Sequence, residues 1–296
     1  MNGDAAPRVD QSDARLGDRL GARLGDRDFR RLAELIEGYC GIRTPPIKRV
    51  LVEGRLRKRL RVLGFANYKE YCDYLFHQDG LTEEITSLID VITTNKTEFF
   101  REPKHYEVLM GMVLAELMQA GIGTRRPLRL WSAGCSTGAE AYTLAMLLSD
   151  AHMLKPDFDF HILGTDICTD VLRIAQRAVY AEEMIGPVPM SMRKRYLLRS
   201  RDSEQQEVRI IPAVRAKVSF RHLNFMEQTY NIGERQDVVF CRNVIIYFDR
   251  PVRQAVLERI CQHITVGGYL FVGHSEHLGD LTLPIRQAAP TVYIRV

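Results

Sequence analysis

The alternation of apolar and polar positions divides this chain into a helical first part and a second part in which strands and helices alternate. Between Phe29 and about Ala120, apolar residues recur every three or four positions, as in helices that bury one face. Beyond that point, compact apolar runs at 128–131, 158–166 and 236–249 are separated by helical patterns. Strands that alternate with helices predict an α/β domain with a parallel sheet, here behind a small all-α domain.

The same pattern predicts the domain organisation. We expect a disordered tail over 1–28, an all-α domain over 29–92, a connecting segment with a helix over 93–120, and an α/β domain over 121–296. The tail repeats a glycine at every fourth position, and each glycine destabilises a helix by about 1 kcal/mol relative to alanine. Within the α/β domain, a strand-prone stretch at about 198–221 interrupts the alternation and predicts a small β-subdomain.

The segment 128–148 is the centre of the predicted α/β domain. An apolar strand leads into a loop of small residues that includes Gly134, and Glu140 then opens an apolar helix. At the carboxyl end of a parallel sheet, such a loop is typical of nucleotide-type sites. It lacks both G-x-G-x-x-G and a Lys-Ser/Thr pair, which argues against a pyrophosphate or triphosphate. An acidic helix start suits the cationic cofactor S-adenosylmethionine; the alternative is a tight turn without a ligand.

Other polar residues stand where the predicted strands end. Asp166 closes the second strand, where an acid accepts ribose hydroxyls, although it could instead cap the next helix. Cys241 and Arg242 interrupt a buried apolar run, and a buried arginine costs free energy unless it meets partners. Tyr247 follows. His274, Ser275 and Glu276 lack a nucleophile motif, so we interpret them as loop residues.

The segment 93–102 precedes the first strand and carries further candidates. Asn95 or Thr97 could cap the helix that follows, because their side-chain oxygens can accept its free N–H groups. Arg101 stands beside two phenylalanines, and a guanidinium binds carboxylates bidentately. We therefore expect Arg101 to reach a carboxylate.

A predicted helix over about 47–63 is strongly basic. Its core face is expected to consist of Leu51, Leu56, Leu60 and Leu63. Its other faces carry one acid, Glu53, against a larger basic set: Lys48, Arg49, Arg55, Arg57, Lys58, Arg59 and Arg61. This imbalance favours an acidic helical partner. Nucleic acid is the alternative, although no aromatic residues are interleaved with the basic ones.

Composition narrows the cellular setting. The formal net charge is +4, and the six cysteines (Cys40, Cys72, Cys135, Cys168, Cys241 and Cys261) are scattered without a C-x-x-C motif. This spacing favours reduced, buried thiols over a zinc site or a disulfide framework. No long uncharged apolar run occurs, and the N-terminus is charged where a signal peptide would be apolar. We expect a cytoplasmic protein that does not insert into a membrane.

Several of these segments together resemble a known family. They are TTNKTEFFRE at 93–102, LWSAGCSTGAEAYTLAM at 130–146, GTDI at 164–167, VVFCRNVIIYFD at 238–249 and GGYLFVGHSE at 267–276. Their order and spacing over 29–296 resemble the CheR-type chemotaxis receptor methyltransferases. The resemblance implies a Rossmann-like S-adenosylmethionine-dependent methyltransferase domain with a small β-subdomain, preceded by a small all-α N-terminal domain.

The resemblance also implies an activity. Such enzymes methylate glutamate side chains on the acidic helical cytoplasmic domains of chemoreceptors and release S-adenosylhomocysteine. The partner implied is that helical bundle and not nucleic acid. The basic residues expected to bind it are Arg55, Arg57, Lys58, Arg59 and Arg61. The protein is expected to act as a monomer and to need no metal. Rival interpretations are a methyltransferase with another acceptor, and a non-catalytic module that binds the cofactor.

Residue roles follow from the same resemblance. Arg101 and Tyr247 fall near the transferred methyl group. The positions that fall on cofactor contacts are Asn95, Thr97, Arg101, Gly134, Glu140, Asp166, Asn224, Phe225, Cys241 and Arg242.

Two departures from the family pattern are visible. Where many relatives have GEEPY, this chain has GAEAY at 138–142, which keeps the second acid as Glu140. The stretch 200–207 lacks the glycines of relatives that dock a receptor's C-terminal peptide. Recognition through such a peptide is therefore not expected, whereas methylation is.

Overall fold

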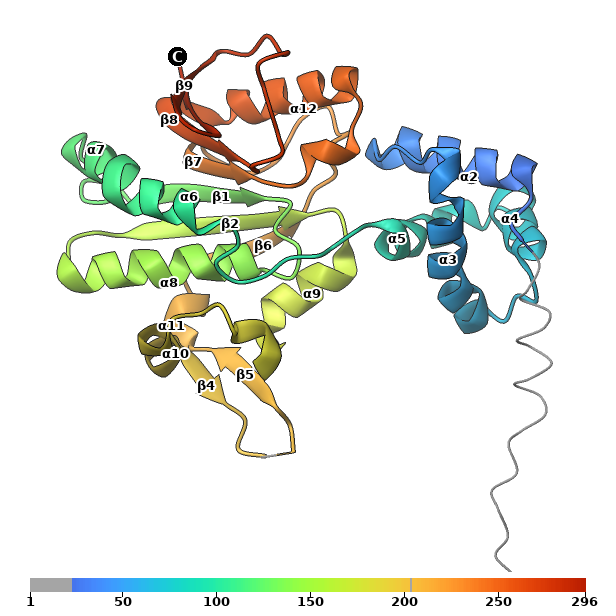
Figure 1. The fold of residues 1–296 in the computed structure, drawn as a ribbon, viewed down its shortest axis with the longest axis horizontal. Coiled ribbons are helices and arrows are strands. Elements are labelled where there is room, and N and C mark those ends of the chain that lie inside the picture. Colours follow the sequence, from blue (N-terminus) through green and yellow to red (C-terminus); the bar gives the residue numbers. More distant parts are fainter. Residues whose placement is uncertain (1–22, 203) are drawn as a thin grey trace, which may run out of the picture. The chain divides into compact units, whose positions relative to one another are not determined.

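The computed structural model describes residues 23–202 and 204–296, and it contains two compact units (Figure 1). Within the described chain, the first unit comprises 23–39 and 43–93, and the second comprises 40–42 and 94–296. The first unit is built from helices, and the second contains a mixed α/β arrangement with a mostly parallel sheet. The predicted fold class is confirmed.

The predicted tail lies mostly outside the described residues, but its last part is ordered. Helix α2 begins at Asp26, and Leu24 before it is buried. The backbone N–H of Leu24 donates to the carboxylate of Glu53 at 2.9 Å. The expectation of disorder up to residue 28 is therefore wrong for 24–28, because a tertiary contact outweighs the local glycine content.

The first unit packs its helices around a core drawn from each long helix. Its elements are α2 (Asp26–Cys40), the 3-10 helix η1 (Pro46–Lys48), α3 (Arg49–Leu63), α4 (Tyr68–His77) and α5 (Leu81–Ile92). Helix α3 ends at Gly64, which has a φ of +78°. A left-handed residue at this position is a common helix stop, and glycine adopts it without steric cost.

The core face of α3 differs from the prediction. The buried residues are Val52, Leu56 and Leu60, whereas Leu51 is 47% exposed and Leu63 is half-buried. Leu56 and Leu60 are thus buried as predicted, whereas Val52 takes the place expected for Leu51 and Leu63 lies at the margin. Neighbouring leucine and valine look alike to a periodicity argument, so packing against the other helices decides between them.

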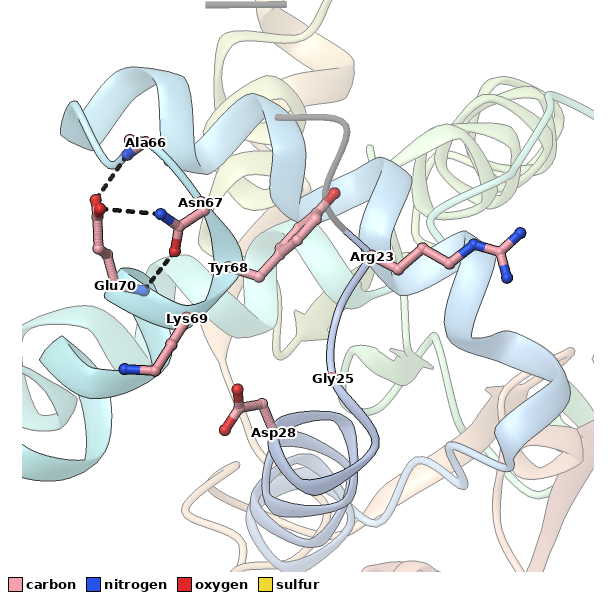
Figure 2. A pocket seen from close by; sticks show the side chains of 8 residues that line it. All are labelled: Arg23, Gly25, Asp28, Ala66, Asn67, Tyr68, Lys69 and Glu70. Atoms are coloured by element: carbon pink, nitrogen blue, oxygen red, sulfur yellow. Dashed lines mark hydrogen bonds between the residues drawn. The ribbon is translucent and has the colours of Figure 1, made fainter. Parts of the chain in front are cut away.

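A hollow of about 660 Å³ lies at the start of α4 (Figure 2). Two of its polar side chains cap the helix. Asn67 Oδ1 accepts from the backbone N–H of Glu70 at 3.0 Å, and the carboxylate of Glu70 accepts from the backbone N–H of Ala66 at 2.9 Å. This reciprocal arrangement caps the orphan donors of a helix start. None of the predicted cofactor residues lines this hollow.

The second unit contains a seven-stranded sheet in the order β6-β2-β1-β7-β8-β10-β9. Its strands are β1 (Leu128–Ala133), β2 (Phe160–Asp166), β6 (Val218–His222), β7 (Gln236–Cys241), β8 (Ile264–Val272), β9 (Ile285–Ala289) and β10 (Val292–Arg295). The first five pair in parallel, and β10 runs antiparallel between β8 and β9. Strand β9 is absent from the sequence prediction.

Each face of this sheet carries its own hydrophobic core, because successive strand residues point to opposite faces. Leu130, Val238 and Phe271 pack into one core together with residues of α8. Trp131 and Val239 pack into the other, together with residues of α12. The covering helices are α6 (Pro103–Val108), the π-helix η2 (Leu109–Val113), α7 (Leu114–Gln119), α8 (Ala139–Leu154), α9 (Thr169–Arg177) and α12 (Arg250–Gln262).

The β-subdomain begins earlier in the chain than predicted and ends before residue 218. It is a three-stranded antiparallel sheet of β3 (Val179–Ala181), β5 (Glu207–Ile210) and β4 (Leu197–Arg199), with η3 (Glu182–Ile185), α10 (Met190–Tyr196) and α11 (Pro212–Arg215) beside it. The segment 218–222 pairs in parallel with β2 and so belongs to the main sheet. A run of strand-forming residues does not reveal which neighbour each strand pairs with, since pairing is non-local.

Candidate active site

The main sheet reverses its order of strands between β1 and β7. The chain adds β2 and then β6 on one side of β1, and returns to place β7 and β8 on the other side. In open α/β sheets, ligands bind outside the carboxyl ends of the strands at such a switch point. The loops after β1, β2 and β7 meet there, and they carry most of the predicted site residues.

Several backbone N–H groups of the loop after β1 already have acceptors within the protein. The N–H groups of Gly134 and Cys135 donate to the carbonyl of Thr165, and that of Gly138 donates to the carbonyl of Cys135. Gly134 has a φ of +82°, and a Cβ there would lie 2.4 Å from Val244 Cγ2. A loop with occupied N–H groups is a poor phosphate site, in agreement with the missing phosphate motifs.

A ligand without phosphate fits this loop better. The hydroxyl oxygen of Thr137 is buried and has no hydrogen-bond partner among the described residues. The small residues leave the loop open to close approach, and an acid stands at the end of β2. These features suit a nucleoside cofactor such as S-adenosylmethionine.

The segment before α6 lies against this loop. Asp166 accepts from the backbone N–H of Ser136 at 2.8 Å and from that of Cys168 at 2.9 Å. Ser136 Oγ donates to the carbonyl of Asn95 at 2.8 Å, and Asn95 Nδ2 donates to the sulfur of Cys168 at 3.3 Å. Asp166 thus both anchors the loop and stands at the predicted ribose position.

Asn95 and Thr97 do not cap the following helix. Helix α6 begins at Pro103, its N-cap position is occupied by Glu102, and that residue makes no side-chain cap hydrogen bond. Asn95 instead contacts the loops after β1 and β2, and Thr97 is half-buried. The capping alternative is therefore wrong for both, because an irregular segment with a turn at 99–100 separates them from the helix.

Arg101 stands between two strained residues. Phe100 and Glu102 both have a φ of +57°, a left-handed conformation that is costly for non-glycine residues, by about 1–3 kcal/mol each. Thr143 Oγ1 accepts the N–H of Phe100 at 3.2 Å, and the carbonyl of Arg101 accepts from Arg242 at 2.8 Å. The guanidinium of Arg101 donates to the carbonyl of Lys96 at 3.1 Å. The backbone is therefore fixed while the side chain keeps further donors for a carboxylate.

Arg242 holds this arrangement together from the end of β7. Its side chain is buried and its Nε donates to Glu140 Oε2 at 2.7 Å. One Nη donates to the carbonyl of Arg101 and contacts His105 Nδ1 at 3.1 Å, and the other donates to the hydroxyl of Tyr106 at 2.9 Å. Burial opposes the charged form, but Glu140 and the other partners outweigh it and raise the pKa of Arg242. The predicted need for buried partners is confirmed.

Glu140 is the carboxylate that pairs with Arg242. Its second oxygen accepts from Ser132 Oγ at 2.6 Å, so both carboxylate oxygens have protein partners. Contact of Glu140 with a cationic cofactor remains a prediction, and a carboxylate retains lone pairs for it. In this structure Glu140 is first of all the counter-ion of Arg242.

Glu102, His105 and His274 bring potential metal-ligand atoms within 4.8 Å of one another. The guanidinium of Arg242 lies 3.6 Å from Glu102 Oε2, which would repel a divalent cation. Burial, followed by the charge of Arg242, lowers the pKa of His105 to about 4, so this ring is neutral near pH 7. We interpret the three residues as part of the network around Arg242.

The remaining predicted residues are distributed around the same strand ends. Asn224 and Phe225 are buried just after β6, and Asn224 Oδ1 accepts from the backbone N–H of Met226 at 2.9 Å. Cys241 is fully buried as the last residue of β7, and burial raises its pKa well above the usual value. Tyr247 is half-buried in the 3-10 helix η4 (Ile245–Tyr247). Their contacts with a cofactor or substrate remain predictions.

Sequence reasoning missed several residues of this region. Ser132, His105 and Tyr106 contact Glu140 or Arg242, and Glu276 binds the loop after β7. A serine inside the apolar strand β1 was the available signal, whereas His105 stands in a helix of mixed character and gave none. Neither type of residue indicates its partner, which lies more than a hundred residues away for His105 and Tyr106.

The parallel sheet has a switch point, the loop after β1 lacks the phosphate-binding motifs, and β2 ends in an acid. These features define a Rossmann-like protein that binds a nucleoside cofactor. Two family models match the chain: "CheR methyltransferase, all-alpha domain" over 27–93 and "CheR methyltransferase, SAM binding domain" over 95–294. The chain belongs to the CheR methyltransferase family, and it is an S-adenosylmethionine-dependent methyltransferase.

Named relatives cover most of the chain. "Chemotaxis protein methyltransferase 2" of Pseudomonas aeruginosa is 35% identical over 266 residues, which is 90% of this chain and 92% of the relative. "Chemotaxis protein methyltransferase" of Borreliella burgdorferi is 35% identical over 84% of this chain and 87% of its own length. That of Escherichia coli is 34% identical over 90% and 89%. Among the described residues, no helix has the length and apolar character needed to cross a membrane.

Proposed function

We propose that this chain methylates glutamate side-chain carboxylates on the cytoplasmic helices of a chemoreceptor, producing glutamate methyl esters and S-adenosylhomocysteine for chemotactic adaptation. The relatives named as chemotaxis protein methyltransferases support the setting. The observation that carries the choice of a carboxylate is Arg101, whose backbone is clamped by Arg242 while its guanidinium keeps free donors. A guanidinium fork matches the geometry of a carboxylate.

The chemistry requires positioning more than acid-base catalysis. When bound, S-adenosylmethionine supplies a methyl group on a sulfonium, and its transfer to a carboxylate oxygen leaves the electron pair of the broken bond on sulfur. A glutamate side chain is ionised at neutral pH, so no protein base is needed. Arg101 would hold the carboxylate in line and displace its water, and such alignment accounts for large rate factors.

The other residues divide between holding the cofactor and shaping the acceptor side. Asn95, Gly134 and Asp166 lie around the loop after β1 and would hold the nucleoside. The set taken from the family resemblance is completed by Thr97, Arg101, Glu140, Asn224, Phe225, Cys241 and Arg242. Tyr247 lies in the loop after β7 and would hydrogen-bond near the reacting carboxylate. Glu140 would contribute through Arg242.

The partner surface we propose is the basic face of α3. Arg57, Lys58 and Arg61 are exposed on this helix. Arg59 is instead paired with buried Glu84, at 2.7 and 2.5 Å, and Arg55 donates to the carbonyl of Ile92. Three of the five predicted residues are therefore presented to solvent, and the other two hold α3 to α5.

Reversing the exposed charges should weaken receptor binding without affecting the chemistry. In the variant Arg57→Glu, Lys58→Glu, Arg61→Glu, we expect the KM for an acidic receptor fragment to rise about tenfold at low salt with kcat nearly unchanged. The reason is the loss of electrostatic attraction, which salt screens, so the difference should shrink in 0.5 M salt. Initial rates at varied receptor concentration measure it.

An equal charge change elsewhere provides the control. Lys155, Arg235 and Arg286 are exposed positions of the second unit, and reversing them should leave the KM within about twofold. Equal effects of both triple variants would show that net charge alone matters, and the proposal for α3 would be wrong.

The proposed reaction has a direct chemical test. We expect radiolabelled methyl groups to pass from S-adenosylmethionine to a receptor cytoplasmic fragment and to be released as methanol by mild base, because carboxyl esters are base-labile. Replacing the candidate receptor glutamates with alanine should abolish the label. Base-stable label would indicate another acceptor atom, and cofactor binding without any label would favour a non-catalytic module.

A further inference from the structure

One buried carboxylate outside the predicted site binds the loop after β7. Glu276 is 2% exposed and follows β8. Its Oε2 accepts from the backbone N–H groups of Gly273 at 2.6 Å and Asn243 at 2.8 Å. Its Oε1 accepts from those of Val244 at 2.9 Å and Ile245 at 3.0 Å. The carboxylate thus joins the two loops at the carboxyl ends of β7 and β8.

The backbone around this carboxylate is shaped to receive it. Asn243 has a φ of +60°, a conformation that asparagine tolerates better than most residues, and three consecutive N–H groups then converge on one side chain. A Cβ on Gly273 would lie 2.8 Å from Asn243 Nδ2 and 2.9 Å from Glu276 Oε2. Converging backbone N–H groups form an anion-binding concavity.

The carboxylate of Glu276 sets the shape of this loop. Burial raises the pKa of Glu276 above its usual value, and the four backbone hydrogen bonds offset this only in part. An apolar side chain in its place would leave four backbone N–H groups without this acceptor. Glu276 therefore determines the geometry that the loop adopts.

The loop leads directly to Tyr247. Val244 donates its N–H to Glu276, and the carbonyl of Val244 accepts the N–H of Tyr247 at 3.2 Å. The first residue of the loop is Arg242, whose guanidinium fixes the carbonyl of Arg101. Glu276 thus holds the backbone between Arg242, which clamps the carbonyl of Arg101, and Tyr247, to which the proposed function gives a role at the acceptor carboxylate.

We propose that Glu276 is a positioning residue for methyl transfer, which acts by holding the backbone of 243–245 so that Tyr247 meets the acceptor carboxylate. The proposal rests on the proposed function for the role of Tyr247. It concerns placement alone, since the four hydrogen bonds of the Glu276 carboxylate all come from backbone N–H groups. A misplacement of about 1 Å can reduce a rate about a hundredfold.

The test compares Glu276→Gln with Tyr247→Phe and with the double variant. Glutamine has the same size, but its NH₂ group would face two N–H donors, so the loop loses part of its support. We expect kcat for a receptor fragment to fall about 10- to 100-fold in Glu276→Gln, with the Kd for S-adenosylhomocysteine within about twofold. In the Tyr247→Phe background, the same change should lower kcat less than threefold, because the effect passes through the tyrosine hydroxyl.

A second readout does not depend on activity. Amide hydrogen exchange in a peptide covering 242–248 should be at least tenfold faster in Glu276→Gln and unchanged in the control Glu258→Gln, an exposed acid of α12 bonded to the Gln254 side chain. If Glu276→Gln does not fold, Glu276→Asp takes its place, because it keeps the charge and withdraws it by one methylene group.

The outcomes are distinct. The positioning role would be overturned if Glu276→Gln lowered kcat equally in the wild-type and Tyr247→Phe proteins. It would also be overturned if Glu276→Gln left the amide hydrogen exchange over 242–248 unchanged. If the wild-type protein methylates no receptor fragment, the proposed function fails by itself. Faster exchange with unchanged affinity for S-adenosylhomocysteine would then still support the hold of Glu276 on the loop, and unchanged exchange would overturn it.

Discussion

Replacing Arg101 with alanine should reduce methyl transfer to a receptor fragment by about 100- to 1000-fold, the range expected when a group that aligns and stabilises the reacting atoms is lost. The fold should survive, because the backbone carbonyl that accepts from Arg242 remains in the variant and the side chain loses only an exposed hydrogen bond to the carbonyl of Lys96. We expect the free energy of unfolding to change by less than about 1 kcal/mol. Base-labile label and urea unfolding measure the two effects.

Two further variants sharpen this prediction. Arg101→Lys keeps the charge but loses the planar fork, so it should recover only part of the rate. Lys104→Ala removes an exposed positive charge three positions later and should stay within about twofold of the wild-type protein. If Arg101→Ala kept most of its activity, the assignment of the carboxylate to Arg101 would be wrong.

Replacing Arg242 with methionine should lower the free energy of unfolding by about 3–5 kcal/mol, as expected when one partner of a buried ion pair is removed. The carboxylate of Glu140 would remain buried without its cation, and the carbonyl of Arg101 and the hydroxyl of Tyr106 would lose their donor. Denaturant unfolding in the absence of cofactor measures this loss, with the m-value as a check on two-state behaviour.

A second substitution separates the cost of the unpaired Glu140 charge from the rest of the stability lost in Arg242→Met. In the double variant Glu140→Gln, Arg242→Met, the uncompensated charge disappears, so part of the stability should return. The exposed pair of Arg250 with Asp280 is the control, and Arg250→Met should cost less than about 1 kcal/mol. A loss at Arg242 as small as that at Arg250 would show that its network contributes little to stability.

Local sequence signals were sufficient for much of the fold. Gly64 ends α3 and Asp249 caps α12, where its Oδ1 accepts from the backbone N–H of Val252 at 3.0 Å. Such signals act within a few residues, so they can be recognised without the tertiary structure. Compact apolar runs likewise predicted β1, β2 and β7, since strands buried on both faces form continuous apolar stretches.

The candidate site was predictable as a set of residues but not as a set of contacts. Asp166 and Arg242 were recognised because a polar residue at the end of an apolar strand demands an explanation. That Arg242 pairs with Glu140, 102 residues away, is visible only in the structure. Arg55 and Arg59 were expected to bind a partner, yet they hold α3 to α5.

What the sequence by itself determined is the type and order of elements, the location of the switch-point loop and the family, because these depend on local pattern and on motifs. Only the tertiary structure decided the partners of the buried charges, the extent of the β-subdomain and the contacts of Glu276. The physical reason is that ion pairs, strand pairing and converging N–H groups form between segments far apart in the chain. The energy of such contacts depends on a geometry that no single segment contains.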